Sequence, residues 1–188
     1  MGQRSEIYVG FETRDGKRRI AGRYFQWNYA ERMISRVYHT ARWLRKRVKY
    51  DVLMDDLVSI IETNFDMIDH QKSCDLVNTR GAEAVIRPDP DDRLDDGRAF
   101  IFVSTDGQIK YCFTGKDLNP LDADGYMTFD TECCYPQYQW TNEEYRDSEK
   151  MRRCRDQIEW LSNNASLMTK DELDRFIGYS YEAEGRTI

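Results

Sequence analysis

The chain has 188 residues, of which 40% are hydrophobic and 33% are charged, and it contains eight Phe, twelve Tyr and four Trp. This aromatic content is too high for a disordered chain and is enough for one ordinary core, so we expect a single domain spanning residues 1–188. There is no run of eighteen apolar residues and no apolar segment near the N-terminus. We therefore expect no membrane contact and no signal peptide, and we predict a cytoplasmic protein.

Charge is distributed unevenly along the chain. Residues 1–50 contain thirteen Lys/Arg and four Asp/Glu, a net charge of +9, whereas residues 51–188 carry a net charge of −15. A polarised molecule can bind nucleic acid or a charged protein through one of its regions, or the two regions can pair with each other inside the fold. The sequence leaves both outcomes open.

The first predicted elements are two strands, Ile7–Phe11 and Ile20–Trp27, separated by Asp15-Gly16. An Asp-Gly pair between two alternating hydrophobic runs indicates a hairpin, because both positions accept a positive φ. Arg18 and Arg19 lie near the tip of this hairpin. They are candidate partner-binding residues, although a solvated turn also explains them.

An amphipathic helix is predicted to follow, beginning at Asn28, which can form a capping box with Glu31. One side of this helix is apolar and is expected to face the core. The opposite side is predicted to be a cationic strip with a large aromatic residue in its middle, suited to an acidic partner. His39 lies on the same side, and the candidate partner-binding residues of the strip are Arg32, Arg36, Trp43, Lys46 and Arg47.

A second apolar stripe runs from Leu53 to Ile68 and either continues this helix or forms an antiparallel pair with it. The segment 87–98 that follows is predicted to be an acidic loop, because Pro88 and Pro90 exclude a helix. Three interpretations of this loop remain open: a solvated connection, a mimic of a nucleic-acid backbone, or a site for a hard cation. Its candidate partner-binding carboxylates are Asp91, Asp92, Asp95 and Asp96.

A second hairpin is predicted from Phe100–Val103 and Ile109–Phe113, joined around Asp106-Gly107. Their alternation and aromatic content are typical of a half-buried sheet. Further strands are expected at Tyr126–Phe129 and at Cys133–Trp140.

The C-terminal helical region is predicted to span residues 141–180. It comprises a charged surface helix that a capping box opens at Thr141 and that runs to about Ser162, and a short helix that Thr169 opens and Gly178 closes. Together, these elements predict an α+β protein. Its antiparallel sheet is built from two Asp-Gly hairpins and is covered by an amphipathic helix pair and by C-terminal helices.

Metal ligands are sparse in this sequence. The five Cys residues contain no C-x-x-C pattern and only two His residues accompany them, so we predict no zinc site and no cofactor. An alternative is a divalent-metal site for phosphodiester cleavage, although the spacing of its carboxylates matches neither an EF-hand nor another metal motif. The residues of this alternative are Asp122, Asp124, Asp130 and Glu132.

The opening of the chain, MGQRSEIYV followed by YFQWNYAERMISR up to Arg36, resembles a family of accessory proteins carried by mobile elements and phages of Firmicutes. Proteins of that family also begin M-G-x-R-S and reach a W-N-Y-x-E-R-M-I-S-R block that starts a helix. A looser similarity connects this opening to M-G-T-R-S phage proteins with an Ntn-hydrolase-like fold. The Ntn mechanism does not carry over, because removal of Met1 would leave Gly2, which has no nucleophilic side chain.

Some accessory proteins of such elements inhibit host CRISPR nucleases. The resemblance therefore implies an anti-CRISPR protein that binds a type II effector, Cas9 or its guide RNA, in the cytoplasm of the bacterial host cell. It would block nucleic-acid binding or cleavage without being an enzyme, so no catalytic residue is predicted. Two alternatives remain open: a metal-dependent nuclease acting on guide RNA or DNA, and a DNA-binding regulator of the mobile element.

Overall fold

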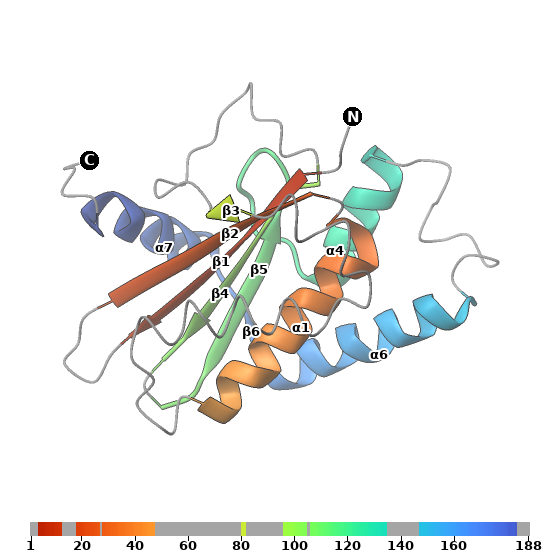
Figure 1. The fold of residues 1–188 in the computed structure, drawn as a ribbon, viewed down its shortest axis with the longest axis horizontal. Helices are drawn as coiled ribbons and strands as arrows, with labels where there is room; N and C mark the ends of the chain where they lie inside the picture. The colour runs from red at the N-terminus through yellow and green to blue at the C-terminus, as the bar shows by residue number, and fades with distance from the viewer. Residues whose placement is uncertain are drawn as a thin grey trace.

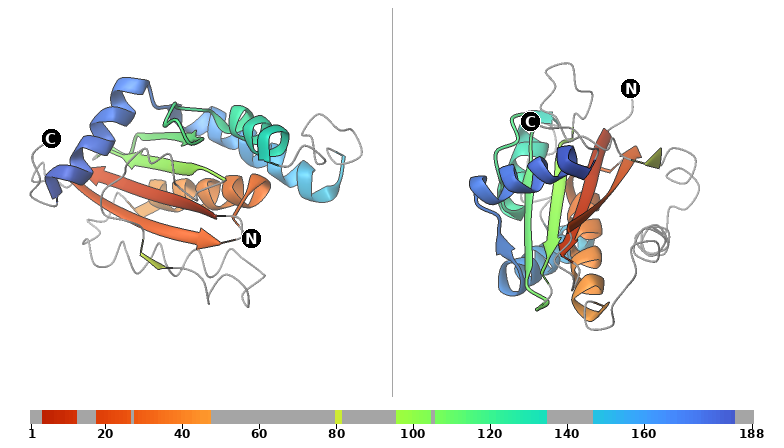
Figure 2. Two further views of the ribbon diagram at one scale, coloured as in Figure 1. Left: turned by 90° about the horizontal axis from the view of Figure 1, so that it is seen from above. Right: turned by 90° about the vertical axis from the view of Figure 1, so that its left-hand side faces the viewer.

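The computed structural model describes residues 4–12, 18–26, 28–47, 80–81, 96–104, 106–134 and 147–183, which form a mixed β-sheet with helices on both faces (Figures 1 and 2). The order of the strands is β3-β2-β1-β4-β5-β6. Successive side chains of a strand point to opposite faces, and each face of this sheet has its own hydrophobic cluster. The predicted α+β class is confirmed.

Two hairpins form the centre of the sheet, as predicted. β1 (Arg4–Glu12) pairs antiparallel with β2 (Arg18–Gln26), and β4 (Arg98–Val103) pairs antiparallel with β5 (Ile109–Thr114). In the second hairpin, Gly107 has a φ of 83°, which suits the glycine predicted for the turn. Two short strands, β3 (Arg80–Gly81) and β6 (Ser166–Leu167), complete the edges.

The prediction of an all-antiparallel sheet is wrong. β1 and β4 are parallel, with Glu6 paired to Arg98 and Phe11 to Val103, and β5 and β6 are also parallel. Parallel neighbours need a long crossover instead of a tight turn. The chain between β2 and β4 provides that crossover and includes α1 (Ala30–Arg47), so the two hairpins meet through their first strands.

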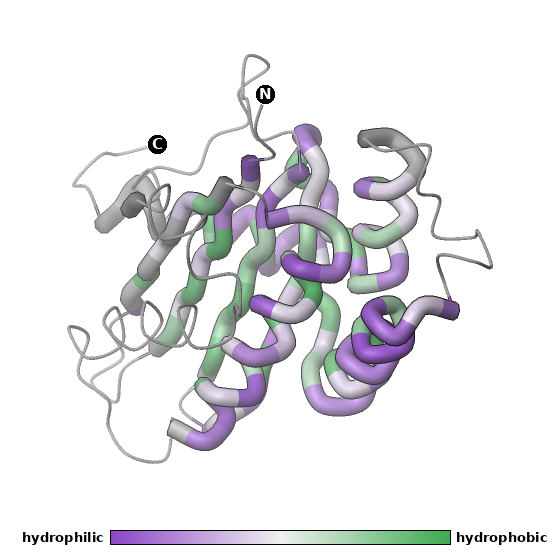
Figure 3. Tube along the Cα trace, turned by 45° about the vertical axis from the view of Figure 1, so that its right-hand side comes forward, coloured by the Kyte–Doolittle hydropathy of each residue, from purple (hydrophilic) through white to green (hydrophobic). Residues whose placement is uncertain are grey.

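Helix α1 packs its apolar side against one face of the sheet, as the sequence predicts. Five of its side chains are completely buried there: Met33, Ile34, Val37, Ala41 and Leu44. Its neighbour is α6 (Glu149–Asn164), which buries Met151 and Leu161 and leaves its hydrophilic turns outward (Figure 3). The expected helix partner, Leu53–Ile68, lies outside the described residues.

Helix α7 (Lys170–Ala183) covers the opposite face. Its capping box is confirmed: the Thr169 backbone N–H donates to Glu172 Oε2 at 3.0 Å, and the Glu172 N–H donates to Thr169 Oγ1 at 3.3 Å. Gly178 does not end the helix, contrary to the prediction. A helical glycine costs only about 1 kcal/mol relative to alanine, and the turn beyond it places Tyr179 against Arg18.

Two further predictions need correction. Tyr126–Phe129 is not a strand: Tyr126 lies in α4 (Ala123–Thr128), and the π-helix Phe129–Cys134 continues it. Asp122 caps α4 by accepting the Gly125 N–H at 2.7 Å, which favours a helix at this point. Helix α6 begins at Glu149 with Ser148 as its N-cap, not near Thr141. The structure does not describe residues 135–146, where that capping box and most of the predicted strand Cys133–Trp140 fall.

Within the described part of the chain, every helix is too short or too polar to cross a membrane.

Candidate functional site

One residue of the predicted cationic strip of α1, Arg36, is buried. Arg36 is only 2% exposed, and its guanidinium lies 4.6 Å from the centre of the Phe25 ring. Arg36 Nη1 also donates a hydrogen bond to Asn28 Oδ1 at 2.5 Å. The Asn28 side chain donates in turn to Ser5 Oγ at 2.7 Å, so the residue predicted as a helix cap joins a buried polar network. Arg36 is therefore structural and is removed from the candidate surface.

The other members of the strip differ in exposure. Arg32 is half-buried with its guanidinium 5.5 Å from the Tyr29 ring, and Trp43 packs against the edge of the core. Burial and the neighbouring Arg42 lower the pKa of His39, so His39 adds no positive charge at neutral pH. Lys46 is exposed, whereas the side chains of Arg19 and Arg47 lie outside the described part of the molecule.

The exposed cations of α1 gather at its C-terminal end. Arg42 donates to the Tyr38 hydroxyl at 2.8 Å, Arg45 donates to Asn164 Oδ1 of α6 at 2.5 Å, and Lys46 is open to solvent. Among the described residues, none of these three cations forms an ion pair with a carboxylate. We call Arg42, Arg45 and Lys46 the basic end of α1.

The sequence placed the cationic strip directly opposite the apolar stripe, but packing by neighbouring elements decides which flank of the helix stays exposed. Strand β2 covers Arg36 through Phe25, while α6 packs beside Tyr38 through Trp160. The run RWLRKR, with four cations in six residues, was the sequence signal that could have identified this end.

Two acidic residues of the N-terminal region are buried, and each forms an ion pair with a cation from later in the chain. Glu6 pairs with Arg98 at 3.3 Å and accepts the Tyr8 hydroxyl at 2.8 Å, and Glu31 pairs with Lys150. The cations in these two contacts come from β4 and α6, not from α1. Within the described residues, Arg42, Arg45 and Lys46 therefore keep their positive charge without an ion-pair partner.

The acidic loop is described only at its end. Asp91, Asp92 and Asp95 lie outside the described ranges, but Asp96 is fully buried, which corrects its assignment as a partner-binding carboxylate. Its backbone carbonyl accepts the Tyr126 hydroxyl at 2.9 Å. Gly97 follows with a φ of 77°, and a Cβ there would collide with the carbonyl oxygen of Thr114. This close approach to β5 carries Asp96 into the core.

Asp96 lies close to a second buried carboxyl group, that of Asp130. Burial, and then the charges of Asp96 and Glu31, raise the pKa of Asp130 to about 8. Asp130 is therefore largely protonated at neutral pH.

The four residues of the alternative nuclease site are Asp122, Asp124, Asp130 and Glu132. The described ones do not form a metal site, because Asp122 caps α4, Asp124 is exposed and Asp130 is buried, while the side chain of Glu132 is not described. Within the described residues, no three His, Cys, Asp or Glu side chains are placed to share a metal ion.

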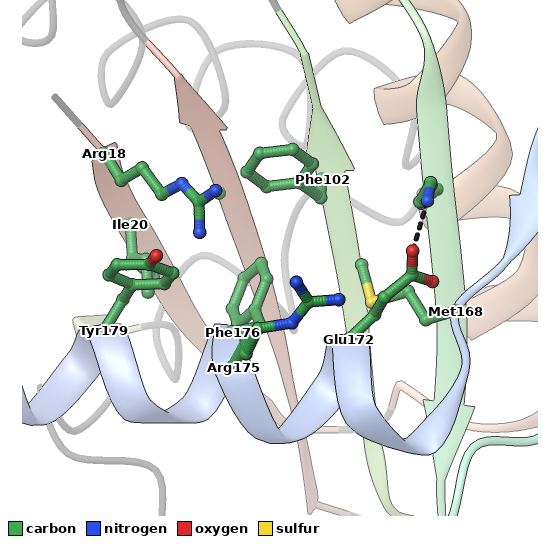
Figure 4. Close-up of a pocket in the computed structure, with 10 residues that line it drawn as sticks. Arg18, Ile20, Phe102, Met168, Glu172, Arg175, Phe176 and Tyr179 are labelled. Carbon is green, nitrogen blue, oxygen red and sulfur yellow. Dashed lines mark hydrogen bonds and ion pairs between the residues drawn. The ribbon is translucent and has the colours of Figure 1, made fainter. Parts of the chain in front are cut away.

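Arg18, the other predicted binding residue that the structure describes, lies on the opposite face of the sheet beside α7. Its guanidinium is 4.3 Å from the centre of the Tyr179 ring and 5.7 Å from that of Phe102. It borders a cavity of about 180 Å³ between α7 and the strands (Figure 4). The sequence did not predict this cavity, because its walls come from four strands and a helix that are far apart in the chain.

The two charged features thus lie on opposite faces of one sheet: the basic end of α1, and the cavity under α7. The first can bind an extended anionic surface, and the second can enclose a small group. The chain matches no protein-family model, no curated protein and no solved structure.

Proposed function

We propose that the protein is a non-enzymatic binding protein whose partner is polyanionic, and that the basic end of α1 is its contact surface. The observation that carries this proposal is the exposure of Arg42, Arg45 and Lys46 on adjacent turns of one helix with only neutral partners among the described residues. A hydrogen bond donated to Tyr38 or Asn164 orients a guanidinium but leaves its charge in place. Arginine side chains held in this way suit phosphate groups, which they can bind through two hydrogen bonds.

The specific partner that we propose is a type II CRISPR effector, Cas9 loaded with its guide RNA, and the protein would act as its inhibitor. The resemblance of residues 1–36 to accessory proteins of Firmicutes mobile elements supports this choice. A loaded effector presents RNA phosphates beside protein surfaces of both signs, which a polarised inhibitor can match. Asp91, Asp92 and Asp95 remain candidates for the effector's basic groove, whereas Asp96 does not.

The test is co-purification with RNA-loaded Cas9 proteins followed by a DNA-cleavage assay. The double variant Arg42→Glu/Lys46→Glu should bind the effector at least about tenfold more weakly, because it places two carboxylates against phosphates. The matched control is Arg152→Glu/Arg153→Glu, with the same change in net charge at the exposed beginning of α6. That control should keep full inhibition, since the beginning of α6 lies beside the beginning of α1 and far from its basic end.

Other outcomes contradict the proposal. Equal loss of binding in both double variants would show that net charge alone acts, not the basic end of α1. Cutting of guide RNA or DNA by the purified protein, abolished by EDTA, would favour the nuclease. Strongly salt-dependent binding to duplex DNA without any effector would favour the DNA-binding regulator.

A further inference from the structure

The cavity under α7 combines an apolar floor with a cationic rim. The floor consists of Ile20, Phe102, Met168 and Phe176, and Gly10 of β1 completes it (Figure 4). The Phe176 ring stands nearly perpendicular to the buried Phe100 ring, at 80° with centroids 5.5 Å apart, so its position is set by packing. An apolar wall with a few polar groups at its mouth is typical of small-ligand sites.

Three cations and one carboxylate border this cavity. Lys110 is paired with Glu172, whose pKa is lowered by Lys110 and by the Thr169 N–H, so both stay charged and cancel each other at neutral pH. Arg18 and Arg175 remain. The Arg18 guanidinium lies over the Tyr179 and Phe102 rings and has no ion pair among the described residues. Arg175 donates from Nε to the carbonyl oxygen of Asp171 at 3.3 Å. The rim therefore has a net positive charge and free guanidinium donors.

Figure 4 shows both guanidinium groups extending into the space between α7 and the strands, with the Phe102 and Phe176 rings beside them. Guanidinium groups bind carboxylates through two parallel hydrogen bonds, and aromatic rings favour a planar apolar body. The volume of about 180 Å³ is below the roughly 300–1,000 Å³ of sites for drug-sized ligands. We propose that this cavity is a binding site for a monocyclic aromatic carboxylate, held by Arg18 and Arg175 over the Phe102 and Phe176 rings.

This inference does not depend on the partner of α1, because the sheet separates the two sites. It is tested on the full chain by titrating benzoate while recording amide chemical shifts and the melting temperature. Benzoate should shift amide signals of α7 and β4 and raise the melting temperature in a saturable manner. Benzamide, which has the ring without the charge, and acetate, which has the charge without the ring, should each bind at least about tenfold more weakly.

Variants locate the site. Arg175→Ala removes an exposed side chain and should weaken benzoate binding about tenfold or more, and Arg18→Lys should weaken it too, because lysine keeps the charge without the planar fork. Arg152→Ala on α6 is the control and should bind normally. The proposal is overturned if benzoate does not bind, if benzamide binds equally well, or if Arg175→Ala keeps full affinity. Equal binding of inorganic phosphate would also contradict it, since the site would then recognise charge alone.

Discussion

The most unusual single residues are Asp96 and Asp130, two carboxyl groups that are both fully buried in one small region. Isolated buried charges are unfavourable, and two neighbouring carboxyl groups resist joint ionisation. The raised pKa of Asp130, about 8, reflects both effects. The core therefore holds a proton that the unfolded chain would release at neutral pH.

Asp130 should make stability depend on pH. Because its pKa in the folded protein lies above its unfolded value, the folded state binds more protons between about pH 4 and pH 8. The free energy of unfolding should therefore fall as pH rises through that window. Asp130→Asn should remove part of this fall and raise the free energy of unfolding at pH 8.5 by at least about 1 kcal/mol. Urea denaturation at pH 5 and pH 8.5 measures this.

The matched control for this experiment is Asp156→Asn, an exposed carboxyl group on α6. It should change the free energy of unfolding by less than about 0.5 kcal/mol at both pH values. If Asp130→Asn behaved like this control, the proton assigned to the buried pair would be absent.

Arg36 is a second residue whose role follows from burial. Arg36→Ala removes its contact with the Phe25 ring and leaves Asn28 Oδ1 without its donor, so we expect a loss of about 2 kcal/mol or more. Arg42→Ala, on the exposed side of the same helix, should lose less than about 0.5 kcal/mol. Chemical denaturation of both variants makes the comparison, and equal stabilities would place Arg36 in solvent.

Among the elements, α7 is attached to the sheet by few side chains, with Phe176 at the centre. Phe176 reaches the sheet where β1 has Gly10: a Cβ at that position would lie 2.5 Å from a ring carbon of Phe176. The absence of a side chain at Gly10 thus allows the ring to lie against the strand. α7 also forms one wall of the proposed ligand site, so its packing and that site are linked.

Gly10→Ala should loosen this contact. The added methyl group must displace the Phe176 ring, which costs about 1–3 kcal/mol as overpacking. Hydrogen exchange should show faster exchange in α7, while β4 and β5 keep their protection. In a Phe176→Leu background the same substitution should cost clearly less, because the smaller side chain can yield. If Gly10→Ala were equally destabilising in the Phe176→Leu background, the destabilisation would not come from a clash with the Phe176 ring.

At the scale of the whole molecule, one sheet separates two differently built faces. Helices α1 and α6 cover one face and place the basic end of α1 at its margin, while α7 covers the other and encloses the cavity. Substitutions at Arg42 and Lys46 therefore test the macromolecular partner without touching the cavity. Substitutions at Arg18 and Arg175 test ligand binding in the cavity without changing the basic end of α1.

Features that depend only on residues close together in the sequence could be predicted from the sequence. The two hairpins, the buried side of α1 and the cap formed by Thr169 and Glu172 all follow from alternation, helical periodicity or turn chemistry within a few residues. Each of these signals is local, so no knowledge of the fold was needed.

Only the tertiary structure decided the parallel pairing of β1 with β4, the burial of Arg36 and Asp96, and the cavity beside Arg18. Each depends on segments far apart in the chain: Phe25 and Asn28 surround Arg36, Tyr126 holds the backbone of Asp96, and α7 faces four strands. A charged residue looks alike in sequence whether it is solvated or enclosed. Its environment is set by the distant surfaces packed around it, and these determine which charges remain for a partner.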